Sequence, residues 1–226
     1  MMLPPAIEVR PFVTSGVDRH APGRSVSPLM APPAAPAVRA THLVDDLRSL
    51  SVLGPVAEAR VRAQLSPASV RTYEAASRTA HLPLAFNIEM AEAVYRVAGE
   101  AGSRRWGTAS FVASLDGFFK PLLVGLTRLV APSPTLMFKT FPQGWATTYR
   151  GCGEFLVSQP APGQTRLVGR GLAPAMLCPA YLAAVCGTLA GAFEVSSYTG
   201  TVTLEPRDPS SPDASWLVEW RRAEKG

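Results

Sequence analysis

Apolar side chains recur at helical spacing through the first two thirds of the chain. In the segment 84–98, the apolar positions are separated by four, three, four and three residues, and they are Leu84, Ile88, Ala91, Tyr95 and Ala98. This spacing places them on one side of a helix and predicts an amphipathic helix. Shorter helices are predicted at 42–53, 55–65 and 67–80, the last of them after the cap and first-turn proline at 66–67.

The helical spacing continues from Phe111 to Leu129, but a proline interrupts it. Pro121 lacks a backbone donor and crowds the turn before it, so we expect a kink or break at 117–121. A second helix is predicted to end at 131–132. One more short helix is predicted at 134–141, stopped by Pro142 and Gly144.

From Trp145 onward the period changes to two, which is typical of strands. Paired strands are predicted at 146–159 and 164–170, joined by a turn at 160–163, with a bend at Cys152 between its two glycines. A helix is predicted at 179–192, followed by strands at 193–197, 201–206 and 215–221. The predicted fold is therefore α+β, with N-terminal helices packed on a C-terminal antiparallel sheet and one helix inserted between strands.

The N-terminal residues differ in composition from the rest. Residues 1–40 hold 8 of the 22 prolines and few large apolar side chains, which predicts a disordered Pro/Ala-rich arm followed by a single α+β domain at 41–226. Prolines and charges interrupt any secretory signal there, and three cysteines do not make a disulfide framework. We therefore expect a cytoplasmic protein.

Charge and hydropathy exclude two classes of partner. The net charge is +5, but the basic residues are scattered and form no stripe, so no nucleic acid is expected to bind. The uncharged segment 171–193 is long enough to span a bilayer, yet it is rich in alanine and contains Pro174 and Pro179. We expect no membrane span.

Candidate chemistry is sparse. The three histidines, His20, His42 and His81, lie far apart in sequence and show no zinc spacing, so no metal or other cofactor is expected. No nucleophile motif is present. Cys152 in its glycine-rich turn and Glu154 nearby are the candidates for a thiol- or carboxylate-dependent enzyme. Glu194, like Glu154 the only acid in an apolar neighbourhood, is a further candidate general base or ligand-binding group.

Aromatic residues gather where the helical half meets the strands. A small apolar pocket with a few polar ends at this junction is the default ligand site of such a fold. The predicted ligand-binding residues are Trp106, Phe111, Phe119, Phe141, Trp145, Tyr149, Arg150 and Tyr181.

Two segments carry a resemblance to known families. The run 104–150, RRWGTASFVASLDGFFKPLLVGLTRLVAPSPTLMFKTFPQGWATTYR, resembles the centre of an uncharacterised paralogous family expanded in myxobacteria, with glycines at the positions of Gly107, Gly117 and Gly125. The run 187–220, GTLAGAFEVSSYTGTVTLEPRDPSSPDASWLVEW, is similar in layout to the end of that family and to 4-vinyl reductase-like sensor domains related to the haem-nitric-oxide-binding fold. The resemblance covers about 45–222 and implies an α+β ligand-binding or scaffold module.

The chain also departs from the wider superfamily. Haem members carry a proximal histidine and a Tyr-x-Ser-x-Arg clamp, and vinyl-reductase-like members carry cysteines in the last hairpin; neither pattern occurs here. The leading hypothesis is a non-enzymatic sensor or ligand-binding regulatory module that holds a small apolar or amphipathic ligand. The alternatives are a protein-interaction scaffold, whose arm or edge strand recruits a protein partner, and an enzyme using Cys152 or Glu154. A homodimer is compatible with each.

Overall fold

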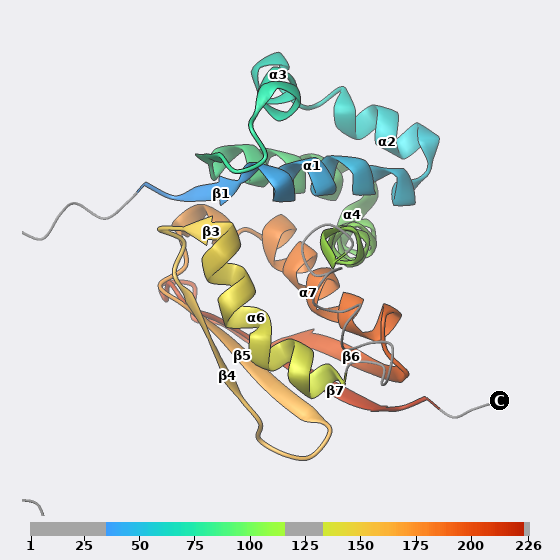
Figure 1. The fold of residues 1–226 in the computed structure, drawn as a ribbon, viewed down its shortest axis with the longest axis vertical. Helices are drawn as coiled ribbons and strands as arrows, with labels where there is room; N and C mark the ends of the chain where they lie inside the picture. Colours follow the sequence, from blue (N-terminus) through green and yellow to red (C-terminus); the bar gives the residue numbers. More distant parts are fainter. Residues whose placement is uncertain (1–34, 116–132, 224–226) are drawn as a thin grey trace, which may run out of the picture. The chain divides into compact units, whose positions relative to one another are not determined.

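The computed structural model describes residues 35–115 and 133–223 and has the α+β fold predicted from the sequence (Figure 1). The first helices are α1 (Ala40–Ser49), the 3-10 turn η1 (Leu50–Leu53), α2 (Pro55–Arg62) and α3 (Pro67–Ala75). The predicted start of α3 is confirmed: the Ser66 hydroxyl accepts a hydrogen bond from the Ser69 amide, with Pro67 at the first helical position.

The amphipathic helix predicted at 84–98 is the first half of a longer element, α4 (Ala85–Ser114). Gly99 divides α4, because its φ of 66° is not helical. The kink predicted at 117–121 and the helix predicted to end at 131–132 lie outside the described residues.

A small sheet in the helical half was not predicted. It consists of β1 (Ala37–Arg39) between β2 (His81–Pro83) and β3 (Tyr149–Arg150), and both pairings are antiparallel. β1 lies within the predicted arm 1–40, so regular structure begins at Ala37, before the predicted boundary.

The prediction that Pro142 and Gly144 end a helix was wrong. The helix α6 (Pro134–Thr148) continues through Pro142, and Trp145, predicted to start the strands, lies on it. Trp145 is only 6% exposed and stacks on Tyr149 and against Phe155, so burial of its large ring offsets the backbone hydrogen bond that the proline removes.

The second sheet has four antiparallel strands in the order β4-β5-β7-β6. They are β4 (Glu154–Ser158), β5 (Gln164–Arg170), β6 (Tyr198–Leu204) and β7 (Ala214–Arg222). The predicted β4–β5 turn is confirmed, and so is the bend at Cys152, where Gly151 and Gly153 have φ of 61° and 78°.

The helix α7 (Pro179–Glu194), preceded by the turn η3 (Pro174–Leu177), is the predicted helix inserted between strands. It lies between α4 and the four-stranded sheet (Figure 1). The strand predicted at 193–197 was wrong: Phe193 is helical and packs edge-on against Phe138, and the next strand starts at Tyr198.

Glycines allow α4 and α7 to cross at backbone contact. A Cβ added at Gly107 would meet the Ala184 carbonyl group, and one added at Gly187 would meet the Arg104 carbonyl group. Gly107 and Gly187 are therefore the residues that let the two helices pack closely. None of the described helices has both the length and the apolar character that crossing a membrane requires.

Candidate functional site

A buried carboxylate joins the first helix to the core. Asp46, on α1, is 2% exposed. Its side chain accepts hydrogen bonds from the Ser110 hydroxyl and, at 2.8 Å, from Nδ2 of Asn87, both on α4. The Trp106 indole donates to the Asp46 backbone carbonyl at 2.8 Å. Burial raises the pKa of Asp46, and the nearby His42 and the hydrogen bonds from Ser110 and Asn87 oppose this shift.

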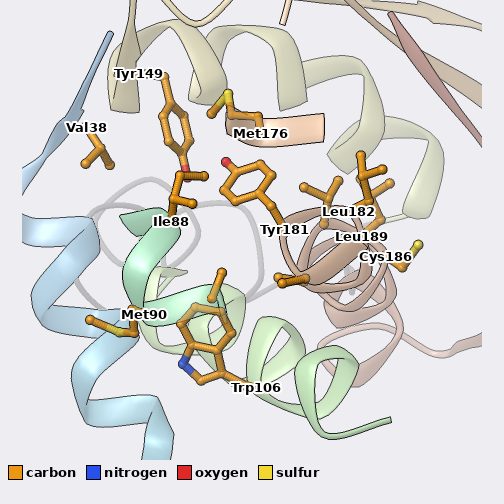
Figure 2. Packing of buried hydrophobic residues seen from close by; sticks show 14 of the residues in the cluster. Val38, Ile88, Met90, Trp106, Tyr149, Met176, Tyr181, Leu182, Cys186 and Leu189 are labelled. Carbon is orange, nitrogen blue, oxygen red and sulfur yellow. The ribbon is translucent and has the colours of Figure 1, made fainter. Parts of the chain in front are cut away.

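Two tyrosines extend this cluster toward α7. The Tyr149 hydroxyl lies 2.9 Å from Nε2 of His42 and donates to Oδ1 of Asn87 at 3.3 Å. Tyr181 donates a hydrogen bond to the Tyr149 oxygen, and Figure 2 shows the two hydroxyl ends approaching each other. Burial raises the pKa of both tyrosines, so both are neutral hydrogen-bonding groups. We call Asp46, Asn87, His42, Tyr149 and Tyr181 the polar network.

The polar network does not form a catalytic relay. A relay through histidine uses one ring nitrogen for the acid and the other for the nucleophile. Here Oδ2 of Asp46, at 3.5 Å, and the Tyr149 hydroxyl both lie beside the same atom, Nε2 of His42. The arrangement connects α1, α4, β3 and α7.

An aromatic stack adjoins the polar network. Trp145 lies 4.1 Å from Tyr149, centroid to centroid, and 4.6 Å from Phe155 on β4. Phe155 in turn contacts Phe141 at 5.0 Å and Trp216 at 5.5 Å. The stack links α6 to the four-stranded sheet.

The residues predicted to bind a ligand occupy separate places. Trp106, Tyr149 and Tyr181 belong to the buried polar region, and Phe141 and Trp145 belong to the aromatic stack. Phe111 packs on α7 at Gly191, Arg150 is exposed on β3, and Phe119 lies outside the described residues. The structure therefore brings Trp145, Tyr149 and Tyr181 together, but these side chains contact one another.

Asp46 and Asn87, which the sequence interpretation missed, had a signal. Asp46 lies three residues after Leu43 and four before Leu50, both fully buried, so it is an acid on the apolar stripe of α1. Asn87 likewise lies between Leu84 and Ile88 on the buried side of α4.

A groove lies between α6 and the edge of the four-stranded sheet. It has a volume of about 340 Å³ and opens to solvent beside β4. Pro142, Phe155 and Val157 form apolar walls, and Lys139 lies at its rim. Further lining comes from Thr135, Leu156, Ser158, Gln159 and Thr165. We call this the α6–β4 groove. A wider hollow of about 450 Å³ lies between α3 and β2, lined by Ala75, Arg71 and Leu82 among others.

The candidate catalytic groups lie in unreactive settings. Cys152 is 1% exposed, and its thiol lies 3.1 Å from the Arg150 carbonyl oxygen. Burial raises the pKa of the Cys152 thiol, and burial also raises the pKa of Cys178 and of Cys186. Glu154 and Glu194 are exposed at the ends of β4 and α7.

The fold is that of H-NOX domains. An Fe(II) unliganded H-NOX protein from K. algicida matches with a TM-score of 0.55 and 9% identity, covering 83% of this chain and 99% of that one. An oxygen-binding H-NOX domain related to soluble guanylate cyclases matches with a TM-score of 0.56 and 8% identity, covering 82% and 96%. No protein-family model matches the chain, and no curated protein matches it in sequence. The sensor-domain resemblance is thus confirmed at the level of the fold, while the myxobacterial family stays a prediction.

Haem, which the H-NOX fold implies, does not fit the residues that the structure describes. Of the two histidines described, His42 is held by Tyr149 and Asp46, and His81 lies on the small sheet. α4 and α7 cross at backbone contact at Gly107 and Gly187, and the side chains of Asp46, Asn87 and Tyr149 hydrogen-bond to one another.

Proposed function

We propose that this chain is a non-enzymatic sensor or ligand-binding regulatory module with the H-NOX fold, which holds a small amphipathic molecule in the α6–β4 groove. The observation that carries the proposal is the groove itself, with apolar walls and one cation at its rim. Its volume of about 340 Å³ lies at the lower end of the range of ligand sites.

The lining predicts the chemistry of the ligand. Lys139 and Pro142 are three residues apart on α6 and therefore lie on one side of that helix. An apolar chain against Pro142, Phe155 and Val157 would place an anionic end near Lys139. A medium-chain fatty acid has this combination of properties and is the probe we choose.

The same groove adjoins the core, which supports a regulatory role. Phe155 lines the groove and contacts Trp145, and Trp145 stacks on Tyr149 of the polar network. A ligand that moves Phe155 therefore acts on a chain of contacts reaching α1, α4 and α7. The unreactive settings of Cys152, Glu154 and Glu194 support a non-enzymatic role.

The test is calorimetric titration of the full chain with decanoate and with decanol. Val157→Trp fills the groove and should weaken decanoate binding at least tenfold. Lys139→Gln should weaken the binding of decanoate and leave the binding of decanol unchanged. Ala75→Trp, which fills the hollow between α3 and β2, is the matched control and should bind like the unmodified chain.

Two results would overturn the proposal. One is the absence of heat with both probes in a chain that melts cooperatively. The other is decanoate binding that survives in Val157→Trp and disappears in Ala75→Trp, which would move the site to the other hollow.

A protein-interaction scaffold is the second candidate, favoured by the exposed edge strand. β4 pairs only with β5 among the described strands, and Leu156 on β4 is 40% exposed. Pull-down with Leu156→Lys tests this role. An accompanying arm deletion should stop at residue 34, because β1 begins at Ala37.

A further inference from the structure

Three basic side chains share the outer face of the small sheet. β1 is its central strand, and it pairs Arg39 with His81 of β2 and Ala37 with Arg150 of β3. Paired residues point to the same face, and positions two apart on a strand do as well. Arg39, His81 and Arg150 are therefore on one face. The opposite face carries Val38, Leu82 and Tyr149, which belong to the core or pack against it.

The residue of β1 that lies among these basic side chains has a small side chain. Ala37 lies beside Arg150 and two residues before Arg39, with Pro83 on its other side. Basic residues therefore surround the methyl group of Ala37, one on its own strand and one on each flanking strand, and we call this position the seat.

The charges at this seat repel one another. Burial, and then the positive charges of Arg150 and Arg39, lower the pKa of His81. The ring also donates a hydrogen bond to the Thr147 carbonyl, while its Nε2 atom is buried without a partner. Among the residues described, no hydrogen bond or ion pair involves the Arg150 guanidinium. Like charges on neighbouring strands are destabilising, so a bound anion would relieve the repulsion.

We infer that the outer face of β2–β1–β3 binds a phosphate group, seated over Ala37 between His81 and Arg150, with Arg39 adding charge. The planar guanidinium of Arg150 offers the paired donors that suit phosphate oxygens. Protonation of His81 adds a third positive charge beside the phosphate, so the bound phosphate favours the protonated ring. The site is separate from the α6–β4 groove, and it does not depend on the proposed function.

The test follows His81 itself. The ring signals of the histidines are recorded by NMR across pH for the full chain, in chloride and in inorganic phosphate at matched ionic strength. Phosphate should raise the pKa of His81 and leave the chemical shifts of the His42 ring unchanged at each pH. Matched ionic strength is required because salt alone screens the repulsion from the arginines.

Substitutions separate binding from simple repulsion. In chloride, Arg150→Gln should raise the pKa of His81, because a neighbouring positive charge is removed. In the same variant the response to phosphate should require about tenfold more phosphate. Arg221→Gln, which removes an exposed charge from β7, is the control and should change neither quantity.

Two further experiments distinguish the possible sources of the phosphate group. Glycerol 3-phosphate is titrated as a soluble phosphomonoester, and vesicles of phosphatidylcholine with or without phosphatidic acid are used in co-sedimentation. A response to either source that Arg150→Gln weakens supports the site and names the source. If phosphate leaves the pKa of His81 unchanged and neither further source binds, the inference is wrong.

Discussion

The α4–α7 crossing provides a direct test of the packing described above. Gly107→Ala adds one methyl group where α4 meets α7. The new Cβ would press on the Ala184 carbonyl oxygen and lie 3.0 Å from both the Ala184 carbonyl carbon and the Thr188 nitrogen. All three are backbone atoms of a buried helix, so no side-chain rotation relieves the contact and one helix must move.

The magnitude follows from two opposing effects. Overpacking a core by a methyl-sized group costs about 1–3 kcal/mol, and more where backbone must shift. Alanine recovers about 1 kcal/mol over glycine in a helix interior. Because the obstacle here is backbone, we expect a net loss of about 2 kcal/mol in the free energy of unfolding. This is a large part of the roughly 5–15 kcal/mol typical of a domain.

Urea unfolding of the full chain, followed by circular dichroism, measures the loss. Gly144→Ala on α6 is the matched control, because a Cβ there meets nothing within 4 Å. It should gain up to about 1 kcal/mol from helix propensity alone. If Gly107→Ala proves as stable as Gly144→Ala, the close crossing and the argument built on it are wrong.

Three further predictions concern thiols, pH and the polar network. Cys178, which is partly exposed, should react with iodoacetamide faster than the buried Cys152, and the reverse order in peptide mapping would revive a thiol-dependent enzyme. The pKa of Asp46 is raised in the folded chain, so its ionised form is less stable there and the chain loses stability as pH rises through the folded pKa. Asparagine has no such titration. In urea titrations, Asp46→Asn should therefore gain stability relative to the unmodified chain between acidic and neutral pH. Tyr149→Phe leaves buried partners unpaired and should cost about 1–3 kcal/mol, whereas Tyr95→Phe at a half-buried position should cost less than about 0.5 kcal/mol in the same assay.

Local signals in the sequence were sufficient where one segment determines its own structure. The cap and proline at Ser66 and Pro67 located α3, and the turn at 160–163 located the β4–β5 hairpin. Such signals fail where burial outweighs them. Pro142 has the local chemistry of a helix end, yet α6 continues because the ring of Trp145 is buried three residues later.

Contacts between distant segments explain the other errors. β1 and β2 have three residues each, so neither strand has an alternating pattern long enough to detect. The partners are also distant in sequence: β2 is more than 40 positions from β1, and β3 is more than 110 positions from it. The polar network has the same origin, since Tyr149 meets His42 across 107 positions. The only local indications of it were the polar residues among buried apolar positions, Asp46 on α1 and Asn87 on α4.

The polar network also explains how the H-NOX fold holds together at its centre in this chain. A buried carboxylate costs stability unless its hydrogen bonds are complete, and Asp46 has partners on α4 and on its own helix. Tyr149 and Tyr181 continue the connections to β3 and α7, so hydrogen bonds between side chains connect four elements. We therefore expect the chain purified without added ligand to unfold in one cooperative transition. Tyr149→Phe should lower the midpoint of this transition, and by the same amount for the helical half and for the sheet. Separate transitions for the two halves in the unmodified chain would show that the network does not couple them.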